Sequence, residues 1–127
     1  MNYSTDNTRI IDRQKVPAPY ELVNKHPIND DISKLVYGTR QEISQILHDK
    51  DDRVLVVVGP CSIHDPESAI EYGKKLIEQN IHFKENLLIV MRVYFEKPRT
   101  TVGWKGLIND PDLNESYQIG KGVEMAR

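Results

Sequence analysis

The chain has 127 residues, 39% hydrophobic and 28% charged, with a formal net charge of −2 at pH 7. This composition is typical of one small globular domain, and a basic excess confined to one short segment argues against general nucleic-acid binding. The longest apolar run, 54–58, is too short for a membrane-spanning helix, which needs about 20 residues. The N-terminus lacks a signal peptide's apolar stretch, and the single cysteine, Cys61, excludes an intrachain disulfide. We therefore expect a cytoplasmic protein.

The first half of the chain is predicted to be an arm followed by a helix. Residues 1–28 are polar and contain three prolines, which indicates an extended arm that lies on another surface or stays mobile. From Asn29 or Asp30, either of which can cap a helix, apolar residues recur on one helical face up to Leu47. We expect residues 1–52 to form an N-terminal extension.

A strand, a helix and a second strand are predicted next. Residues 54–58 and 87–91 are apolar runs without polar alternation, which is typical of strands buried on both faces in a parallel sheet. Asp65 and Pro66 are a good cap and a good first residue for the helix between them. A long irregular segment follows from Val93 to about Asp112, and another helix is predicted to start at 113–116.

This order predicts an α/β fold, with residues 53–127 forming the first β-α-β part of a TIM (β/α)8 barrel that is incomplete in this chain. Two parallel strands cannot close a sheet, and a barrel of about 250 residues needs six more. The chain also ends at Arg127 inside a predicted helix. We therefore expect a fragment or a truncated reading frame.

The segment from Met91 to Gly106 is the most informative part of the sequence. Four cations against one acid, Glu96, give these sixteen residues a local charge of +3, whereas the rest of the chain is not basic. Pro98 favours an extended backbone at Lys97, which would place Lys97 and Arg99 on one side with the Thr100 hydroxyl beside them. Such a group suits a phosphate or carboxylate. A solvated basic loop is the alternative.

Three further residues are expected at the same rim of the sheet. Cys61 and His64 follow the first strand and Arg92 ends the second, and reactive groups in α/β barrels lie beyond the carboxyl ends of the strands. Cys61 could be a metal ligand, a nucleophile or a small buried hydrophobe, and a metal shared with His64 is conceivable. Arg92 needs an anionic substrate, a carboxylate partner or solvent.

The residues Gly59-Pro-Cys-Ser-Ile-His-Asp-Pro66 and the run from Met91 to Pro111 strongly resemble the type I 3-deoxy-D-arabino-heptulosonate 7-phosphate (DAHP) synthases. The match covers about residues 50–127, and residues 1–49 resemble the N-terminal extension of the feedback-regulated members. The resemblance implies a TIM-barrel transferase that condenses phosphoenolpyruvate with D-erythrose 4-phosphate, giving DAHP and phosphate. This is the first step of the shikimate pathway to chorismate and the aromatic amino acids.

The resemblance also implies roles for individual residues. Cys61 matches a ligand of a divalent metal (Mn, Fe, Co or Zn), Arg92 and Lys97 match phosphoenolpyruvate contacts, with Lys97 as the catalytic residue, and 97–100 match the erythrose 4-phosphate motif: Lys97, Pro98, Arg99 and Thr100. The family's other metal ligands are not found in this sequence, so we expect the chain to be inactive alone. A homo-oligomer inhibited by an aromatic amino acid is also implied, and the opening Met1-Asn2-Tyr3 favours phenylalanine.

Two alternatives stay open at this stage. The first is the sister enzyme that makes 3-deoxy-octulosonate 8-phosphate, although the sequence Lys-Pro-Arg-Thr favours the erythrose substrate because the sister family resembles Lys-Ala-Asn-Arg there. The second is a noncatalytic fragment, in which the arm and the helix at 30–48 regulate or bind full-length subunits.

Overall fold

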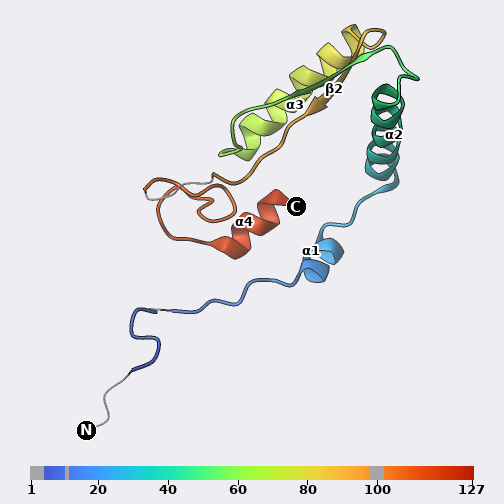
Figure 1. Cartoon of the computed structure of the whole chain (residues 1–127). Coiled ribbons are helices and arrows are strands. Elements are labelled where there is room, and N and C mark those ends of the chain that lie inside the picture. The colour runs from blue at the N-terminus through green and yellow to red at the C-terminus, as the bar shows by residue number, and fades with distance from the viewer. Residues whose placement is uncertain (1–4, 11, 98–101) are drawn as a thin grey trace.

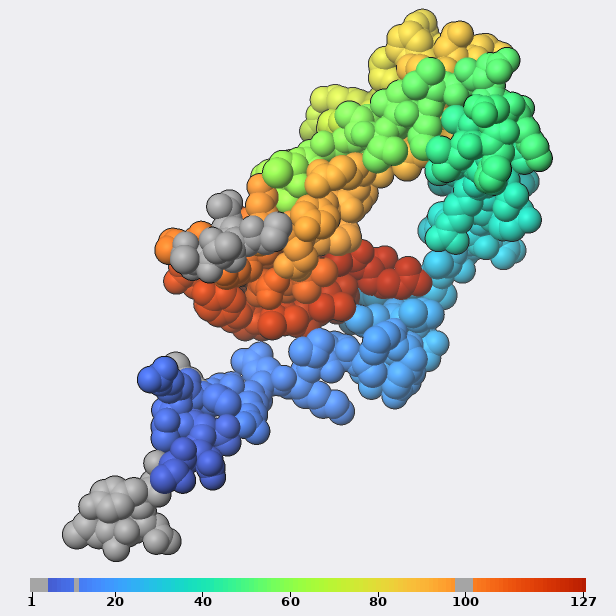
Figure 2. Space-filling view, in the orientation of Figure 1, coloured from blue at the N-terminus to red at the C-terminus, as the bar shows by residue number. Residues whose placement is uncertain are grey.

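The computed structural model describes residues 5–10, 12–97 and 102–127. Figure 1 shows an extended N-terminal arm followed by helices, a two-stranded sheet with one long helix beside it, and a C-terminal loop and helix below the sheet. In the space-filling view of Figure 2 the N-terminal arm projects away from the rest of the molecule. The elements are α1 (Pro19–Lys25), α2 (Asp30–Leu47), β1 (Val54–Val58), α3 (Pro66–His82), β2 (Leu87–Met91) and α4 (Ile119–Ala126).

The sheet confirms the predicted strand, helix, strand order. β1 and β2 pair in parallel, from Val54 opposite Leu87 to Val58 opposite Met91. The helix α3 connects them and packs against β2. Because parallel strands end at the same edge, the loop after Val58 and the residues after Met91 emerge side by side. This edge carries the candidate site.

The expectation that both strands are buried on both faces is wrong for β1. Its Val54 and Val57 side chains are each 59% exposed, whereas Leu88 of β2 is 5% exposed. Within the described residues β1 has a single strand neighbour, β2, and its contact with α2 is small. A continuous apolar run therefore identified the strand correctly but not its local burial.

The N-terminal segment contains a helix that the sequence analysis missed. Residues 19–25 form α1, although 1–28 was predicted to be extended. Pro19 occupies the first turn, where its missing N–H is harmless, and the Glu21 carboxylate accepts a hydrogen bond from the Ala18 N–H at 3.2 Å. Pro19, one of the three prolines interpreted as signs of an arm, instead marks a helix start.

The caps of α2 and α3 lie where the sequence places them. The Asn29 side chain accepts a hydrogen bond from Ile32 N at 2.8 Å, which decides between Asn29 and Asp30 as the cap of α2. Asp65 accepts hydrogen bonds from Glu67 N and Ser68 N at the start of α3. The hydrogen bond from the Ser68 hydroxyl, and after it those from the backbone N–H groups, lower the pKa of the Asp65 carboxyl.

The last helix starts later than predicted. Instead of beginning at 113–116, α4 begins at Ile119. Leu113, Glu115 and Tyr117 all have positive φ values, between 51° and 61°. Because residues in the left-handed region cannot continue a right-handed helix, the chain turns repeatedly here before α4 can form.

The N-terminal segment docks on α4. Glu124 Oε1 lies 2.5 Å from Lys25 Nζ and 3.0 Å from His26 Nε2, and both partners lower the pKa of the Glu124 carboxyl. Pro17 passes beside Gly120, where an added Cβ would lie 3.6 Å from Pro17 Cδ. The division into 1–52 and 53–127 stays a prediction, and these contacts tie the two parts together.

Candidate functional site

The candidate site begins where β1 and β2 end. Arg92 N donates a hydrogen bond to Val58 O at 2.8 Å, which extends the strand pairing by one residue. Gly59 follows, and a Cβ on it would lie 2.1 Å from Arg92 O. Only glycine allows the two backbones to approach this closely, so the sequence at the end of β1 brings the Cys61 loop directly beside Arg92.

Arg92 contacts this loop with its guanidinium. Its Nη1 donates to the carbonyl oxygens of Pro60 at 2.8 Å and Cys61 at 3.2 Å, and its Cζ lies 5.1 Å from the centre of the Tyr94 ring. The side chain remains solvent-exposed. Of the partners that the sequence analysis offered, an anion, a carboxylate or solvent, the structure shows solvent, and the guanidinium also binds two main-chain carbonyls, which the sequence did not predict.

Lys97 is held by a short antiparallel bridge. Glu96 pairs with Gly106, Lys97 N donates to Lys105 O at 2.8 Å, and Leu107 N donates to Phe95 O at 2.7 Å. Leu107 is 1% exposed and fixes this bridge to the body of the protein. As a result, Lys97 Nζ lies 3.2 Å from Cys61 Sγ.

The structure thus brings Cys61, Arg92 and Lys97 together, as the position of all three beyond the strand ends predicts. Pro98, Arg99 and Thr100, the other predicted substrate contacts, lie outside the described residues. The assembled groups are one thiol, one guanidinium and one ammonium. With two cations and no acid among them, the arrangement favours an anionic ligand.

The described residues do not make a metal site by themselves. Cys61 is exposed, and no group of three or more His, Cys, Asp or Glu side chains within 5–10, 12–97 and 102–127 could hold an ion. Tight sites for divalent metals use three or four protein ligands. Cys61 supplies one sulfur donor, and the described residues add no third ligand to an ion shared by Cys61 and His64.

Asp110 is a buried group that the sequence analysis did not single out. It is 4% exposed, its Oδ2 accepts from Glu115 N at 3.1 Å, and its main-chain oxygen accepts from Trp104 Nε1 at 2.7 Å. Its Oδ1 has no hydrogen-bond partner in the described part of the chain. Asp110 therefore organises the loop behind Lys97. Its place in Asn-Asp-Pro, a turn-like sequence, was the available signal.

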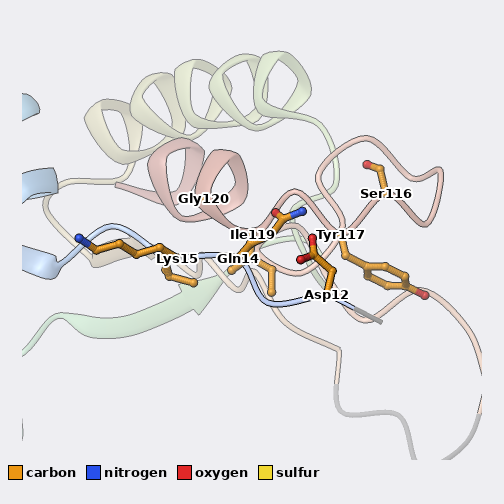
Figure 3. Close-up of a pocket in the computed structure, with 8 residues that line it drawn as sticks. Asp12, Gln14, Lys15, Ser116, Tyr117, Ile119 and Gly120 are labelled. Carbon is orange, nitrogen blue, oxygen red and sulfur yellow. The ribbon is translucent and has the colours of Figure 1, made fainter. Parts of the chain in front are cut away.

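Two cavities lie near these elements. The larger, about 360 Å³, is formed by the N-terminal arm and the start of α4, with Asp12, Gln14, Lys15, Ser116, Tyr117 and Ile119 around it (Figure 3). It contains none of the predicted site residues. The smaller, about 150 Å³, lies between the 60–65 loop and α3 and is lined largely by apolar surface.

Within the described residues, no helix is both long and apolar enough to cross a membrane. The strand-end cluster of cations on a parallel β-α-β unit defines the class of the protein, an α/β protein with a rim suited to phosphorylated or carboxylated ligands. Comparisons with known proteins make this class more specific.

Residues 24–126 match the model of the DAHP synthetase I family. The chain is 50% identical over 127 residues to the Phe-sensitive phospho-2-dehydro-3-deoxyheptonate aldolase of Escherichia coli K12, covering 100% of this chain and 36% of that protein. It is 50% identical over 123 residues to the Trp-sensitive aldolase of Buchnera aphidicola from Acyrthosiphon pisum, covering 97% and 35%. A solved phospho-2-dehydro-3-deoxyheptonate aldolase from Francisella tularensis SCHU S4 superposes with a TM-score of 0.88 at 53% identity, covering 93% of this chain and 35% of that one.

The chain belongs to the DAHP synthetase I family. It spans about a third of the length of the curated relatives that it matches.

Proposed function

We propose that this chain provides the phosphoenolpyruvate-binding edge of a DAHP synthase, an enzyme that condenses phosphoenolpyruvate with D-erythrose 4-phosphate and water to give DAHP and phosphate. The observation that carries the proposal is the contact of Lys97 Nζ with Cys61 Sγ at 3.2 Å, beside the Arg92 guanidinium. A TIM barrel would be completed by six further strands outside this chain.

Each residue has a role suited to its chemistry. Arg92 presents a planar fork that binds a phosphate or carboxylate at two points, and Lys97 presents a point charge. Together they would hold phosphoenolpyruvate next to the sugar phosphate and offset the repulsion between two anions. Arg99 and Thr100 would bind erythrose 4-phosphate through the motif that includes Lys97 and Pro98. The 3-deoxy-octulosonate 8-phosphate alternative is disfavoured by the family match to DAHP synthetases.

The proposal includes a divalent metal, for which the described residues supply too few ligands. Cys61 would be one of its ligands, and the remaining ligands would have to come from outside the described residues. A single thiolate holds such an ion poorly, so we expect the 127-residue chain to be inactive alone.

Regulation by an aromatic amino acid is proposed because one relative is Phe-sensitive and another is Trp-sensitive, each 50% identical to this chain. The opening Met1-Asn2-Tyr3 favours phenylalanine. Association with full-length subunits, the alternative role of the arm and the helix at 30–48, is supported by the apolar stripe of α2, whose Leu35 and Leu47 are each 68% exposed.

The function is tested by a chimera in which this chain replaces the corresponding first third of the Escherichia coli Phe-sensitive aldolase. We expect the purified chimera, supplied with divalent metal, to form DAHP and release phosphate from the two substrates, while the isolated chain forms none. A folded chimera that releases no phosphate while the parent aldolase is active would contradict the proposal.

A further inference from the structure

We propose that Arg92 is a positioning residue for the Cys61 thiol, in addition to any contact with substrate. Its guanidinium clamps the loop that carries the thiol, and so sets where Sγ lies relative to Lys97. The inference deepens the proposed function, on which the purpose of the thiol rests, but the clamp itself is a property of this chain.

The clamp consists of contacts from the residues after β2 to the loop after β1. Arg92 Nη1 donates to two consecutive carbonyl oxygens, those of Pro60 and Cys61, at 2.8 and 3.2 Å. The Tyr94 carbonyl oxygen accepts from Ile63 N at 2.7 Å. The carbonyl of Cys61 is therefore held directly, and the backbone is tied down again two residues later.

The loop has few other means of holding this conformation. Pro60 has no N–H to donate, and Gly59, immediately before it, is the least restricted residue type. Burial of Ser62 and Ile63, at 7% and 4% exposure, anchors the far side of the loop, whereas Cys61 itself is exposed. Without the guanidinium, Cys61 would lose the hydrogen bond to its carbonyl oxygen. Among the described contacts of Cys61 with the residues after β2, only that of Sγ with Lys97 would remain.

The guanidinium can clamp the loop and still bind an anion. Both carbonyl contacts use Nη1, which leaves the N–H groups of Nε and Nη2 for a second partner. The ring of Tyr94, 5.1 Å from Cζ, keeps the guanidinium plane in place. Lysine at this position would keep the positive charge but would replace the rigid planar fork with one flexible ammonium group, which holds the carbonyls and an anion in a less fixed geometry.

This difference between arginine and lysine gives the test. In the 127-residue chain Cys61 is the only cysteine, so selective labelling yields a single cysteine amide signal in an NMR spectrum. We expect Arg92→Lys to shift or broaden this signal and to speed hydrogen exchange of the Ile63 amide about tenfold through local opening. Protection of the α3 amides and the thermal midpoint should change little.

The matched control is Arg53→Lys at the opposite end of β1. Arg53 also makes several hydrogen bonds, to Asp51 and Glu42, so its replacement reports on the general effect of losing a well-bonded arginine. We expect it to leave the Cys61 signal and Ile63 exchange as in the unmodified chain. If Arg92→Lys does not fold, Tyr94→Leu, which removes only the ring beneath the guanidinium, should give the same local changes at smaller size.

A Cys61 signal at its original position with Ile63 exchange within twofold of the unmodified chain would overturn the positioning role. Phosphoenolpyruvate affinity, measured by calorimetry on the same variants, separates this result from the proposed function. Weaker binding with an unchanged Cys61 signal would leave Arg92 as a substrate contact alone. A loosened loop in a chain that never binds phosphoenolpyruvate would support the clamp and count against the substrate role.

Discussion

Replacing Gly106 by alanine is expected to lower the free energy of unfolding by about 3 kcal/mol, near the upper end of ordinary single substitutions. Gly106 has φ +125°, a conformation that side chains rarely adopt, and a Cβ would lie 2.3 Å from Phe95 O and 2.7 Å from Glu96 Cα. Both obstacles are backbone, so the bridge between Glu96 and Gly106 must separate. Urea unfolding of the 127-residue chain measures the change.

The matched control is Gly38→Ala in the middle of α2, where an added Cβ meets nothing within 4 Å. Removing a glycine from a helix interior should stabilise the chain by roughly 0.5–1 kcal/mol. If Gly106→Ala lowers the free energy of unfolding and Gly38→Ala raises it, the loss of stability lies at the bridge between Glu96 and Gly106, next to Lys97. A Gly106→Ala chain as stable as the unmodified one would show that this bridge is not rigid.

Replacing Lys97 by methionine in the chimera is expected to lower kcat/KM for DAHP formation by at least about 100-fold, the loss typical of removing one group that stabilises charge at a reacting centre. Methionine keeps an unbranched side chain of similar length, so the change removes mainly the ammonium that lies 3.2 Å from Cys61 Sγ. Initial rates over a range of phosphoenolpyruvate concentrations measure the effect.

Lys84→Met serves as the control for that variant. The Lys84 side chain is 69% exposed, and its only described ion pair is a loose one of 3.7 Å with Glu85. Lys84 precedes β2, at the opposite end of the strand from the cluster. Its replacement should leave kcat/KM within twofold. Equal activity of the Lys97 and Lys84 variants would remove Lys97 from the proposed site.

The sequence predicts the central elements well because their signals are local. The apolar runs at 54–58 and 87–91 and the cap residues Asn29 and Asp65 are sufficient to place both strands and two long helices. Helix α1 was missed because Pro19 is compatible with both an arm and a helix start. The start of α4 was placed too early because left-handed φ at Leu113 and Tyr117 leaves no clear mark in non-glycine residues.

The site was predictable in location but not in detail. Strand ends that share an edge place Cys61 and Arg92 together whatever the loops do. The contact of Lys97 with Cys61 depends on the bridge from Glu96 to Gly106, and the carbonyl partners of Arg92 depend on the turn at Pro60. The contacts of Arg92 and Lys97 with the 60–61 loop join residues 31 to 36 positions apart, and no local pattern encodes them.

The most direct measurement is a titration of the labelled 127-residue chain with phosphoenolpyruvate, followed by NMR. The proposal predicts saturable shifts at Cys61, Arg92 and Lys97, with a dissociation constant on the order of millimolar because only part of a complete site is present. The residues around the cavity in Figure 3, such as Asp12 and Tyr117, should not respond. Shifts spread evenly over the surface lysines, with none at Cys61, would contradict the claim that the ends of β1 and β2 form a site for phosphorylated anions.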